Sequence, residues 1–322
     1  MPASSGRPVV LVVVGPTAVG KSAFALDLCE RHAGEIVSVD SMQVYRGLDA
    51  ATSKPTAAER ARAPHHGVDL AEPGEDFSMG DFVRAAERAI TGIVARRRLP
   101  VLVGGTGLYL KALLRGMAAA PRRDPRLRQR LLDRAARRGV ASLHRLLTRL
   151  DPDSAARLGP RDRQRLVRAL EVRIAAGRPL SAVLRDEPFG VERYDAVKIG
   201  LDMDRRALYA RIDARVDRFF AAGLVDEVRR LLGAGRPPAA NAFKAIGYRE
   251  VAAHLRGETD LEAAMALTRR NTRRYAKRQM TWFRRETGVA WFSLDPGASD
   301  PCTAARAAAA AGLAAKGWPA WA

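Results

Sequence analysis

The first half of the chain alternates short apolar runs with segments of helical periodicity. The expected strands are Val9–Val14, Ile36–Asp40, Val101–Val103 and Ala196–Leu201, and the expected helices among them are Ser22–Arg31 and Asp81–Arg97. Two of these strands, Val9–Val14 and Val101–Val103, are apolar throughout, which is typical of parallel strands buried on both faces of a sheet. The alternation predicts an α/β fold in which helices flank a parallel sheet.

Helical periodicity dominates the chain after Leu201. The expected helices are 205–222, 225–232, 246–255 and a long helix that opens at Thr259. Thr259 and Glu262 have the T-x-x-E spacing of a capping box, in which each side chain bonds a backbone N–H of the other residue. Val289–Leu294 is expected to add an edge strand, and an Ala-rich helix is expected after Thr303.

The stretch Pro121–Gly190 differs from the rest of the chain in its charge. It contains 18 arginines, no lysine and eight acidic residues, a net charge of +10. Its leucines recur at helical spacing, as at Leu127, Leu131, Leu143, Leu146 and Leu147. We interpret the stretch as a basic helical insert and divide the chain into core residues 1–115, an insert at 116–194 and core residues 195–322. The charge favours a nucleic-acid surface, although a solvated face of a helical bundle would show the same pattern.

The whole chain is strongly basic. Its 322 residues include 55 Lys and Arg against 35 Asp and Glu, a formal net charge of +20. This charge indicates a polyanionic partner, although Arg-rich chains also arise from genomes of high GC content. The two cysteines, Cys29 and Cys302, lack the spacing of a zinc site or of a disulfide framework. No apolar run approaches the length of a transmembrane helix, so we expect a cytoplasmic protein with no membrane partner.

The strongest chemical signal is the segment GPTAVGKS, which matches the phosphate-binding pattern G-x-x-x-x-G-K-[ST]. Its residues are Gly15, Pro16, Thr17, Ala18, Val19, Gly20, Lys21 and Ser22. The segment follows an apolar strand and precedes a helix, where backbone N–H groups and the positive end of the helix form a cradle for phosphates. Lys21 adds a positive charge, and the Ser22 hydroxyl is a candidate ligand of Mg²⁺. The segment therefore predicts a site for a diphosphate group.

The P-loop alone does not reveal whether the phosphates belong to ATP. A P-loop ATPase usually has an acidic residue at the end of another strand, but Val101–Val103 is followed by the sequence GGTG, residues 104–107. Asp40, at the end of Ile36–Asp40, is the available acid. It could be a Mg²⁺ ligand for a nucleotide, a base that accepts a proton from a nucleophile, or a structural N-cap. A nucleoside or nucleotide kinase is therefore an alternative at this stage.

A second basic feature lies on the long C-terminal helix. The segment Thr268–Arg285 contains eight Lys or Arg and no acidic residue. Its cationic face is expected to consist of Arg270, Arg273, Arg274, Lys277, Arg278, Arg284 and Arg285, which recur at steps of three to four residues. Tyr275, Gln279 and Trp282 line up on another face, where they either stack on splayed bases or pack against the sheet.

Taken together, these residues resemble one family, the tRNA dimethylallyltransferases, which prenylate an adenosine beside the anticodon. The matching segments are GPTAVGKS (15–22), DSMQVYRGLD (40–49), the HHGVDL and EPGEDFS stretch (65–78), LPVLVGGTGLYLKALL (99–114), RDRQRLVRALEV (161–172), KAIGYRE (244–250) and RRYAKRQMTWFR (273–284). Among them, DSMQVYRG and GGTGLY are far more specific than the P-loop. The chain departs from the family at 49–55, where DAATSKP replaces the common DIGTAKP, and at Arg163, where Gln is frequent. It lacks the Cys/His finger of eukaryotic relatives, which implies a bacterial-type enzyme.

The resemblance implies that a dimethylallyl group moves from dimethylallyl diphosphate to the N6 amine of the adenosine 3′-adjacent to the anticodon, with release of pyrophosphate. The P-loop would bind the diphosphate with Mg²⁺, and Thr17, Lys21 and Arg215 would act on the leaving group. Asp40 would accept the proton of the attacking amine. The implied tRNA contacts are Asp40, Ser41, Met42, Gln43, Thr106, Gln164, Arg165, Leu166, Val167, Arg168, Lys244, Gly247, Tyr248, Arg249, Lys277, Arg278, Gln279, Trp282 and Arg284. We expect a P-loop NTPase-like core with an inserted all-helical tRNA-binding domain, acting as a monomer on the anticodon stem-loop.

Overall fold

The computed structural model describes residues 6–117, 121, 124–186, 190, 192–235 and 240–319. The chain forms two compact units, one of residues 1–114 with 193–322 and the other of residues 115–192. Among the described residues no helix is long and apolar enough to cross a membrane.

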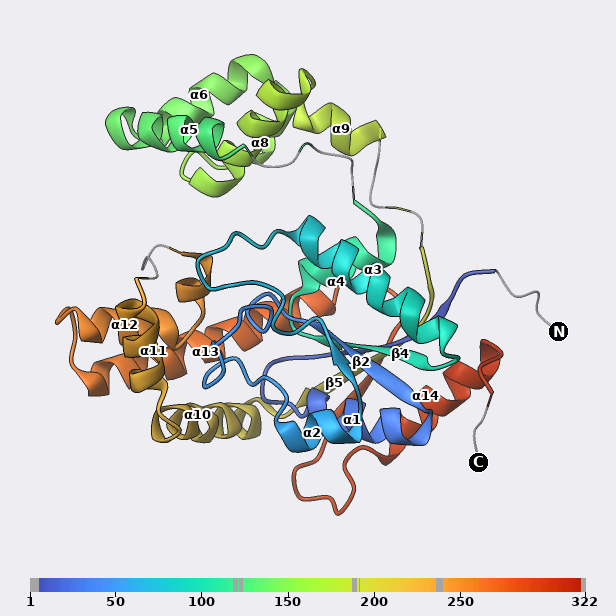
Figure 1. Ribbon diagram of the computed structural model, residues 1–322. Coiled ribbons are helices and arrows are strands. Elements are labelled where there is room, and N and C mark those ends of the chain that lie inside the picture. Colours follow the sequence, from blue (N-terminus) through green and yellow to red (C-terminus); the bar gives the residue numbers. More distant parts are fainter. Residues whose placement is uncertain are drawn as a thin grey trace. The chain divides into compact units, whose positions relative to one another are not determined.

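A six-stranded sheet forms the centre of the first unit in the described part of the chain, and every pairing in it is parallel (Figure 1). The strands lie in the order β3-β2-β4-β1-β5-β6. Their bounds are β1 Val9–Val14, β2 Gly34–Val39, β3 His65–His66, β4 Leu99–Gly104, β5 Asp195–Met203 and β6 Val289–Leu294. The predicted α/β fold is confirmed, and β1 and β6 have the bounds expected from sequence. β1 lies near the middle of the sheet, and its Val10–Val13 segment has no exposed surface, as both-face burial requires.

Helices cover both faces of this sheet. α1 (Lys21–Arg31) and α14 (Thr303–Ala315) belong to one hydrophobic cluster with β1, β4 and β5, while α3 (Met79–Ala95) lies on the opposite side (Figure 1). The other helices of this unit are α2 Ala57–Arg62, α4 Gly107–Arg115, α10 Arg205–Ala221, α11 Leu224–Gly233, the 3₁₀ turn η1 Asn241–Lys244, α12 Tyr248–Leu255 and α13 Leu261–Phe283. The strands converge on one edge of the sheet with their carboxyl ends, where ligands bind in open α/β folds.

The start of α13 differs from the expectation. The capping box proposed for Thr259 and Glu262 is wrong, because Asp260 is the N-cap and its carboxylate accepts the backbone N–H of Ala263 at 2.7 Å. Aspartate is as good an N-cap as threonine, so the T-x-x-E spacing did not decide between neighbours. Capping boxes do occur at Thr56 before α2 and at Ser78 before α3.

A second hydrophobic cluster in this unit fixes the segment after β2. Val44, Tyr45 and Leu48 are buried against α11 and α12, through residues such as Leu224 and Val251. The carboxylate of Glu227 reinforces this contact, because it accepts the backbone N–H groups of residues 49 and 50 at 2.9 and 3.1 Å. The segment that carries the family motif DSMQVYRG is therefore packed against α11 and α12.

The second unit is entirely helical over its described residues. Its helices are α5 Pro125–Arg138, α6 Ala141–Leu150, α7 Pro152–Arg157, α8 Arg163–Ala176 and α9 Leu180–Asp186. The helical periodicity predicted here is confirmed, because Leu127, Leu131, Leu143 and Leu147 are buried in one cluster. Its arginines lie mostly outside that cluster, while the buried carboxylate of Glu171 accepts hydrogen bonds from Arg128.

Candidate active site

The P-loop lies between β1 and α1. Gly15 has a φ of 146°, and a side chain at this position would lie 2.3 Å from the carbonyl oxygen of Leu201 on β5. Gly20 has a φ of 112° at the residue before α1 begins with Lys21. Both conformations favour glycine. The two glycines of the pattern are thus required by backbone geometry, and the N-terminus of α1 faces the loop as a phosphate cradle requires.

Lys21 turns back into the P-loop, where its Nζ donates a hydrogen bond to the carbonyl oxygen of Pro16 at 2.7 Å. Burial and, to a smaller extent, the nearby Arg215 guanidinium lower the pKa of Lys21 to about 7, although the Asp40 carboxylate opposes this shift. A bound diphosphate would favour the charged ammonium, because an opposite charge at short range stabilises it. Two basic side chains, Lys21 and Arg215, therefore lie near one carboxylate, that of Asp40.

Asp40 is the first residue after β2 and comes near these cations. Its Oδ1 accepts the backbone N–H groups of Met42 at 2.8 Å and Gln43 at 3.3 Å, so it closes a turn rather than capping a helix. Burial raises the pKa of Asp40, and the two N–H donors together with Lys21 and Arg215 oppose this rise. Its second carboxylate oxygen has no hydrogen-bond partner among the described residues. That oxygen is available to accept a proton.

Arg215 reaches the P-loop from α10. Its Nη1 donates to the Oγ1 of Thr17 at 2.8 Å, and its Nη2 donates to the hydroxyl of Ser53. Among the described residues neither Arg211 nor Arg218 donates to a P-loop residue. Burial lowers the pKa of Arg215 to about 10, an effect that the Asp40 carboxylate opposes. The guanidinium remains charged near pH 7 and suits a phosphate oxygen.

The GGTG loop after β4 lies beside Asp40. Thr106 accepts the backbone N–H of Ser41 on its Oγ1 at 3.1 Å, and its own N–H donates to the carbonyl of Val39 at 3.2 Å. A side chain at Gly104 would lie 2.1 Å from the Val39 carbonyl oxygen. Gly104 therefore allows the loop to pack closely on β2.

α13 packs one face on both loops. Gln279 is 4% exposed; its Oε1 accepts the Thr17 N–H at 2.8 Å, and its Nε2 donates to the Gly105 carbonyl at 3.1 Å. Tyr275 donates to the same carbonyl at 3.4 Å. The indole of Trp282 fills the space beside Gly107 but remains 42% exposed. This face was expected either to stack on RNA bases or to pack inside the protein. Tyr275 and Gln279 pack inside the protein, whereas Trp282 is still accessible to a ligand.

Known proteins resemble this chain over most of its length. The IPP transferase family model matches residues 43–286, and the isopentenyl transferase model matches residues 8–63. Relatives named tRNA dimethylallyltransferase from Geobacter metallireducens and Anaeromyxobacter sp. (strain K) are 51% and 52% identical, over 90% and 88% of this chain and 94% and 92% of their own. The chain belongs to the tRNA dimethylallyltransferase family.

Solved structures in this family share the fold. The tRNA isopentenylpyrophosphate transferase of Bacillus halodurans has a TM-score of 0.71 at 39% identity, covering 97% of this chain and 98% of that one. A eukaryotic dimethylallyltransferase acting on tRNA has a TM-score of 0.82 at 26% identity, covering 98% and 81%. These comparisons support a tRNA-modifying prenyltransferase and not the kinase alternative.

For a member of the tRNA dimethylallyltransferase family, several residues expected to contact tRNA lie in the interior. Leu166 and Val167 have no exposed surface and belong to the core of the second unit. Tyr248 is also fully buried and donates to Glu227 at 2.5 Å, and the neighbouring Gly247 is buried. Such burial argues against direct tRNA contacts, so we reassign these residues to packing. The exposed members of the same set are Gln164, Arg165, Lys244, Arg249, Lys277, Arg278, Trp282 and Arg284.

Gln43 connects the DSMQ segment with Ser53, a residue that was not predicted to belong to the site. Its Oε1 accepts the hydroxyl of Ser38 at 2.7 Å, and its Nε2 donates to the carbonyls of Thr52 and Ser53 at 3.0 and 2.9 Å. Ser53 in turn accepts a hydrogen bond from Arg215. Gln43 thus orients the loop that accepts a hydrogen bond from Arg215. No local signal could have revealed Ser53, which lies 162 residues from Arg215.

The cations of α13 and of the two residues that follow it, Arg284 and Arg285, fall into two groups. Arg269, Arg273 and Arg284 form ion pairs with aspartates on α10 and β5. The exposed cations without an ion pair among the described residues are Arg270, Arg274, Lys277, Arg278 and Arg285. The sequence correctly indicated a basic helix, but only this second group keeps its full charge for an outside partner.

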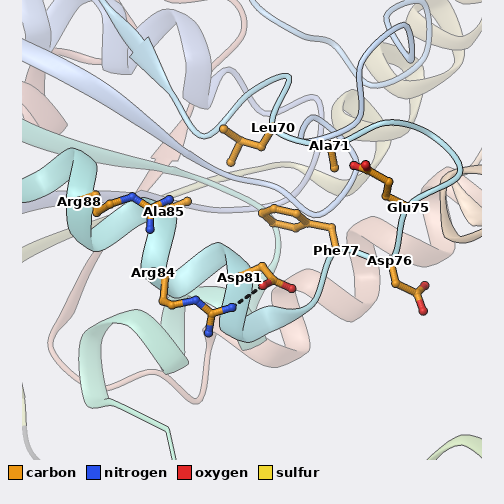
Figure 2. Close-up of a pocket in the computed structure, with 9 residues that line it drawn as sticks. All are labelled: Leu70, Ala71, Glu75, Asp76, Phe77, Asp81, Arg84, Ala85 and Arg88. Atoms are coloured by element: carbon orange, nitrogen blue, oxygen red, sulfur yellow. Dashed lines mark hydrogen bonds and ion pairs between the residues drawn. The ribbon is translucent and has the colours of Figure 1, made fainter. Parts of the chain in front are cut away.

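A pocket of about 490 Å³ beside α3 has no part in this site (Figure 2). Phe77 lies between the Leu70–Ala71 segment and α3, and Asp81 pairs with Arg84 at the rim. None of the residues that line this pocket is among the predicted site residues.

Proposed function

We propose that this protein transfers a dimethylallyl group from dimethylallyl diphosphate to the N6 amine of the adenosine 3′-adjacent to the anticodon in tRNA. One observation carries the proposal. Asp40 is a half-buried carboxylate whose second oxygen has no hydrogen-bond partner among the described residues, and it lies near a P-loop whose Lys21 and Arg215 favour an anion. A base next to a diphosphate cradle suits a reaction in which the diphosphate leaves and an amine attacks.

In this reaction the N6 nitrogen forms a bond to the allylic carbon while the bond from that carbon to the diphosphate oxygen breaks. Pyrophosphate leaves with the electron pair, and Asp40 accepts the proton that the amine loses. Lys21, the P-loop N–H groups and Arg215 with Thr17 would stabilise the charge that develops on the leaving oxygen. The dimethylallyl group and the target adenine would lie between the P-loop and the GGTG loop.

Mg²⁺ is part of the proposal as a partner of the diphosphate. Ser22 is exposed at the start of α1, and its hydroxyl has no hydrogen-bond partner among the described residues. The described residues contain no group of three His, Cys, Asp or Glu that could hold a metal. A single hydroxyl donor, that of Ser22, fits Mg²⁺, because this ion commonly takes one or two protein ligands together with phosphate oxygens and water. The ion would neutralise charge on the pyrophosphate.

The cations of α13 that have no ion pair among the described residues would contact the anticodon stem-loop of the tRNA, and so would the exposed Gln164 and Arg165 of α8. Phosphate contacts of this kind give affinity without sequence preference. We propose that the enzyme acts as a monomer in the cytoplasm. The relatives' names support tRNA as the substrate, and the charge of the described helices supports an RNA backbone as the contact.

The test compares the wild type with Asp40→Asn. Mass spectrometry should detect one dimethylallyl group per tRNA when the wild-type protein is incubated with tRNA and dimethylallyl diphosphate. Asparagine keeps the oxygen that accepts the Met42 N–H, so the turn should persist while the base is lost. We expect turnover to fall about 10²- to 10⁴-fold, with tRNA affinity unchanged. Equal turnover in the variant would remove Asp40 from this role, and transfer of phosphate from ATP would favour a kinase.

A further inference from the structure

We propose that Gln279 is a positioning residue that ties the diphosphate-binding loop to the loop beside the general base. The inference rests on the proposed function, because it concerns how that reaction is arranged. It also changes the interpretation of Gln279, which the family resemblance assigned to tRNA contact.

Both ends of the buried Gln279 amide are hydrogen-bonded to backbone groups. A glutamine amide has one carbonyl oxygen and one NH₂ group. The oxygen accepts the Thr17 N–H at 2.8 Å, the nitrogen donates to Gly105 at 3.1 Å, and the residue is 4% exposed. Buried polar groups that are hydrogen-bonded at both ends tend to define a single arrangement of the chain around them. Gln279 therefore fixes the two loops to each other instead of facing solvent.

The two loops hold the two sides of the reaction. Thr17 lies in the P-loop and receives Arg215 on its hydroxyl. Gly105 precedes Thr106, which accepts the N–H of Ser41 next to Asp40. The Gln279 side chain thus links the P-loop, which would bind the leaving diphosphate, to the loop that contacts the residue next to Asp40. A shift of about 1 Å between reacting groups can reduce rate about 100-fold, so such a link bears on catalysis.

The sequence of the GGTG loop is matched to this side chain. A Cβ at Gly105 would lie 2.0 Å from the Gln279 Nε2, and a Cβ at Gly107 would lie 2.1 Å from the Trp282 ring. Neither position has room for a side chain while Gln279 and Trp282 keep these conformations. The helix that carries the exposed cations Arg274 and Arg278 therefore also packs against the GGTG loop.

The experiment measures pyrophosphate binding and steady-state kinetics in Gln279→Met. Methionine preserves length and apolar packing but neither accepts the Thr17 N–H nor donates to Gly105. We expect pyrophosphate affinity to fall about 10-fold and kcat/KM for dimethylallyl diphosphate to fall about 10- to 100-fold, with KM for tRNA unchanged. Gln279→Glu keeps the acceptor but loses the donor and adds a negative charge, so it should also weaken pyrophosphate binding.

Thr268→Val is the matched control. Thr268 is buried in the same helix, and its hydroxyl donates only to the Ala264 carbonyl one turn earlier. This change perturbs α13 without touching either loop, and pyrophosphate affinity should remain at the wild-type value. A Gln279→Met variant that raises KM for tRNA and binds pyrophosphate normally would overturn the inference and restore the tRNA contact. If the wild type transfers no prenyl group yet Gln279→Met loses pyrophosphate affinity, the proposed function fails while the tie between the loops stands.

Discussion

At the scale of single residues, Lys21 links the fold to a measurable pH dependence. Its pKa falls to about 7, mainly through burial, so above this pH the ammonium loses its proton in the free protein. A diphosphate ligand requires the charged form, and binding above pH 7 must therefore take up a proton. We expect affinity for dimethylallyl diphosphate to decline as pH rises from 7 to 9, approaching about tenfold per unit. Isothermal titration calorimetry over this range would measure it.

The control for this prediction is Lys21→Arg. A guanidinium stays charged throughout the range, so the part of the decline that belongs to Lys21 should disappear. Titration of the ligand itself affects both proteins equally and cancels in the comparison. Identical pH profiles for the two proteins would mean that Lys21 is already charged at pH 9 before the ligand binds.

Residues that neighbour one another in sequence were predictable, and residues that meet only in space were not. The P-loop pattern specified Gly15, Gly20 and Lys21 because each requirement is local. Arg215 was one of three candidate arginines, and only the fold brings it to Thr17. The two bonds of Gln279 span 262 and 174 residues, so periodicity could assign its face of the helix but not its partners.

At the scale of elements, hydrophobic patterning located most of the fold. The strands at 9–14 and 289–294 matched their expected bounds because apolar runs flanked by polar turns are distinctive. α4 was not predicted, since it begins at Gly107 within a glycine-rich loop and depends on packing against the rest of the unit. The ion pairs of α13 could not be predicted from the sequence either, because their aspartates lie far away in the chain, on α10 and β5.

The two groups of cations on α13 make a prediction at this scale. Arg273 donates to Asp213 and lies over the Tyr209 ring at 5.4 Å, whereas the adjacent Arg274 is exposed without an ion pair among the described residues. Arg274→Gln should weaken tRNA binding and reduce the slope of log affinity against log salt by about one, as loss of one phosphate contact does. Filter binding of tRNA from low to moderate salt would measure the slope.

Arg273→Gln is the comparison, and it should change the salt slope far less. Its guanidinium is already neutralised, and its loss should instead lower thermal stability by breaking a contact between α10 and α13. A larger salt effect from Arg273 than from Arg274 would contradict the assignment of the two groups.

At the scale of the whole molecule, the helical unit is inserted in the sheet-based unit with its ends close together. The backbone N–H of Arg193 donates to the carbonyl of Leu114 at 2.8 Å, directly across the insertion. Each unit has its own hydrophobic cluster, with the sheet in one and α5, α6 and α8 in the other. Separate cores and adjacent ends are the features that allow a domain to be removed without unfolding its host.

This arrangement predicts that residues 115–192 can be replaced by a short Gly-Ser linker. The remaining unit should fold, because its sheet and both helical layers are complete, and it should bind pyrophosphate with wild-type affinity, because Lys21, Asp40 and Arg215 all belong to it. Affinity for tRNA should fall at least tenfold, about 1.4 kcal/mol, since the arginines of the insert are gone. Full tRNA affinity in the shortened protein would assign recognition to α13 alone. Loss of pyrophosphate binding in a protein that still shows the native thermal transition would instead mean that the insert supports the P-loop, which the described contacts of the first unit do not require.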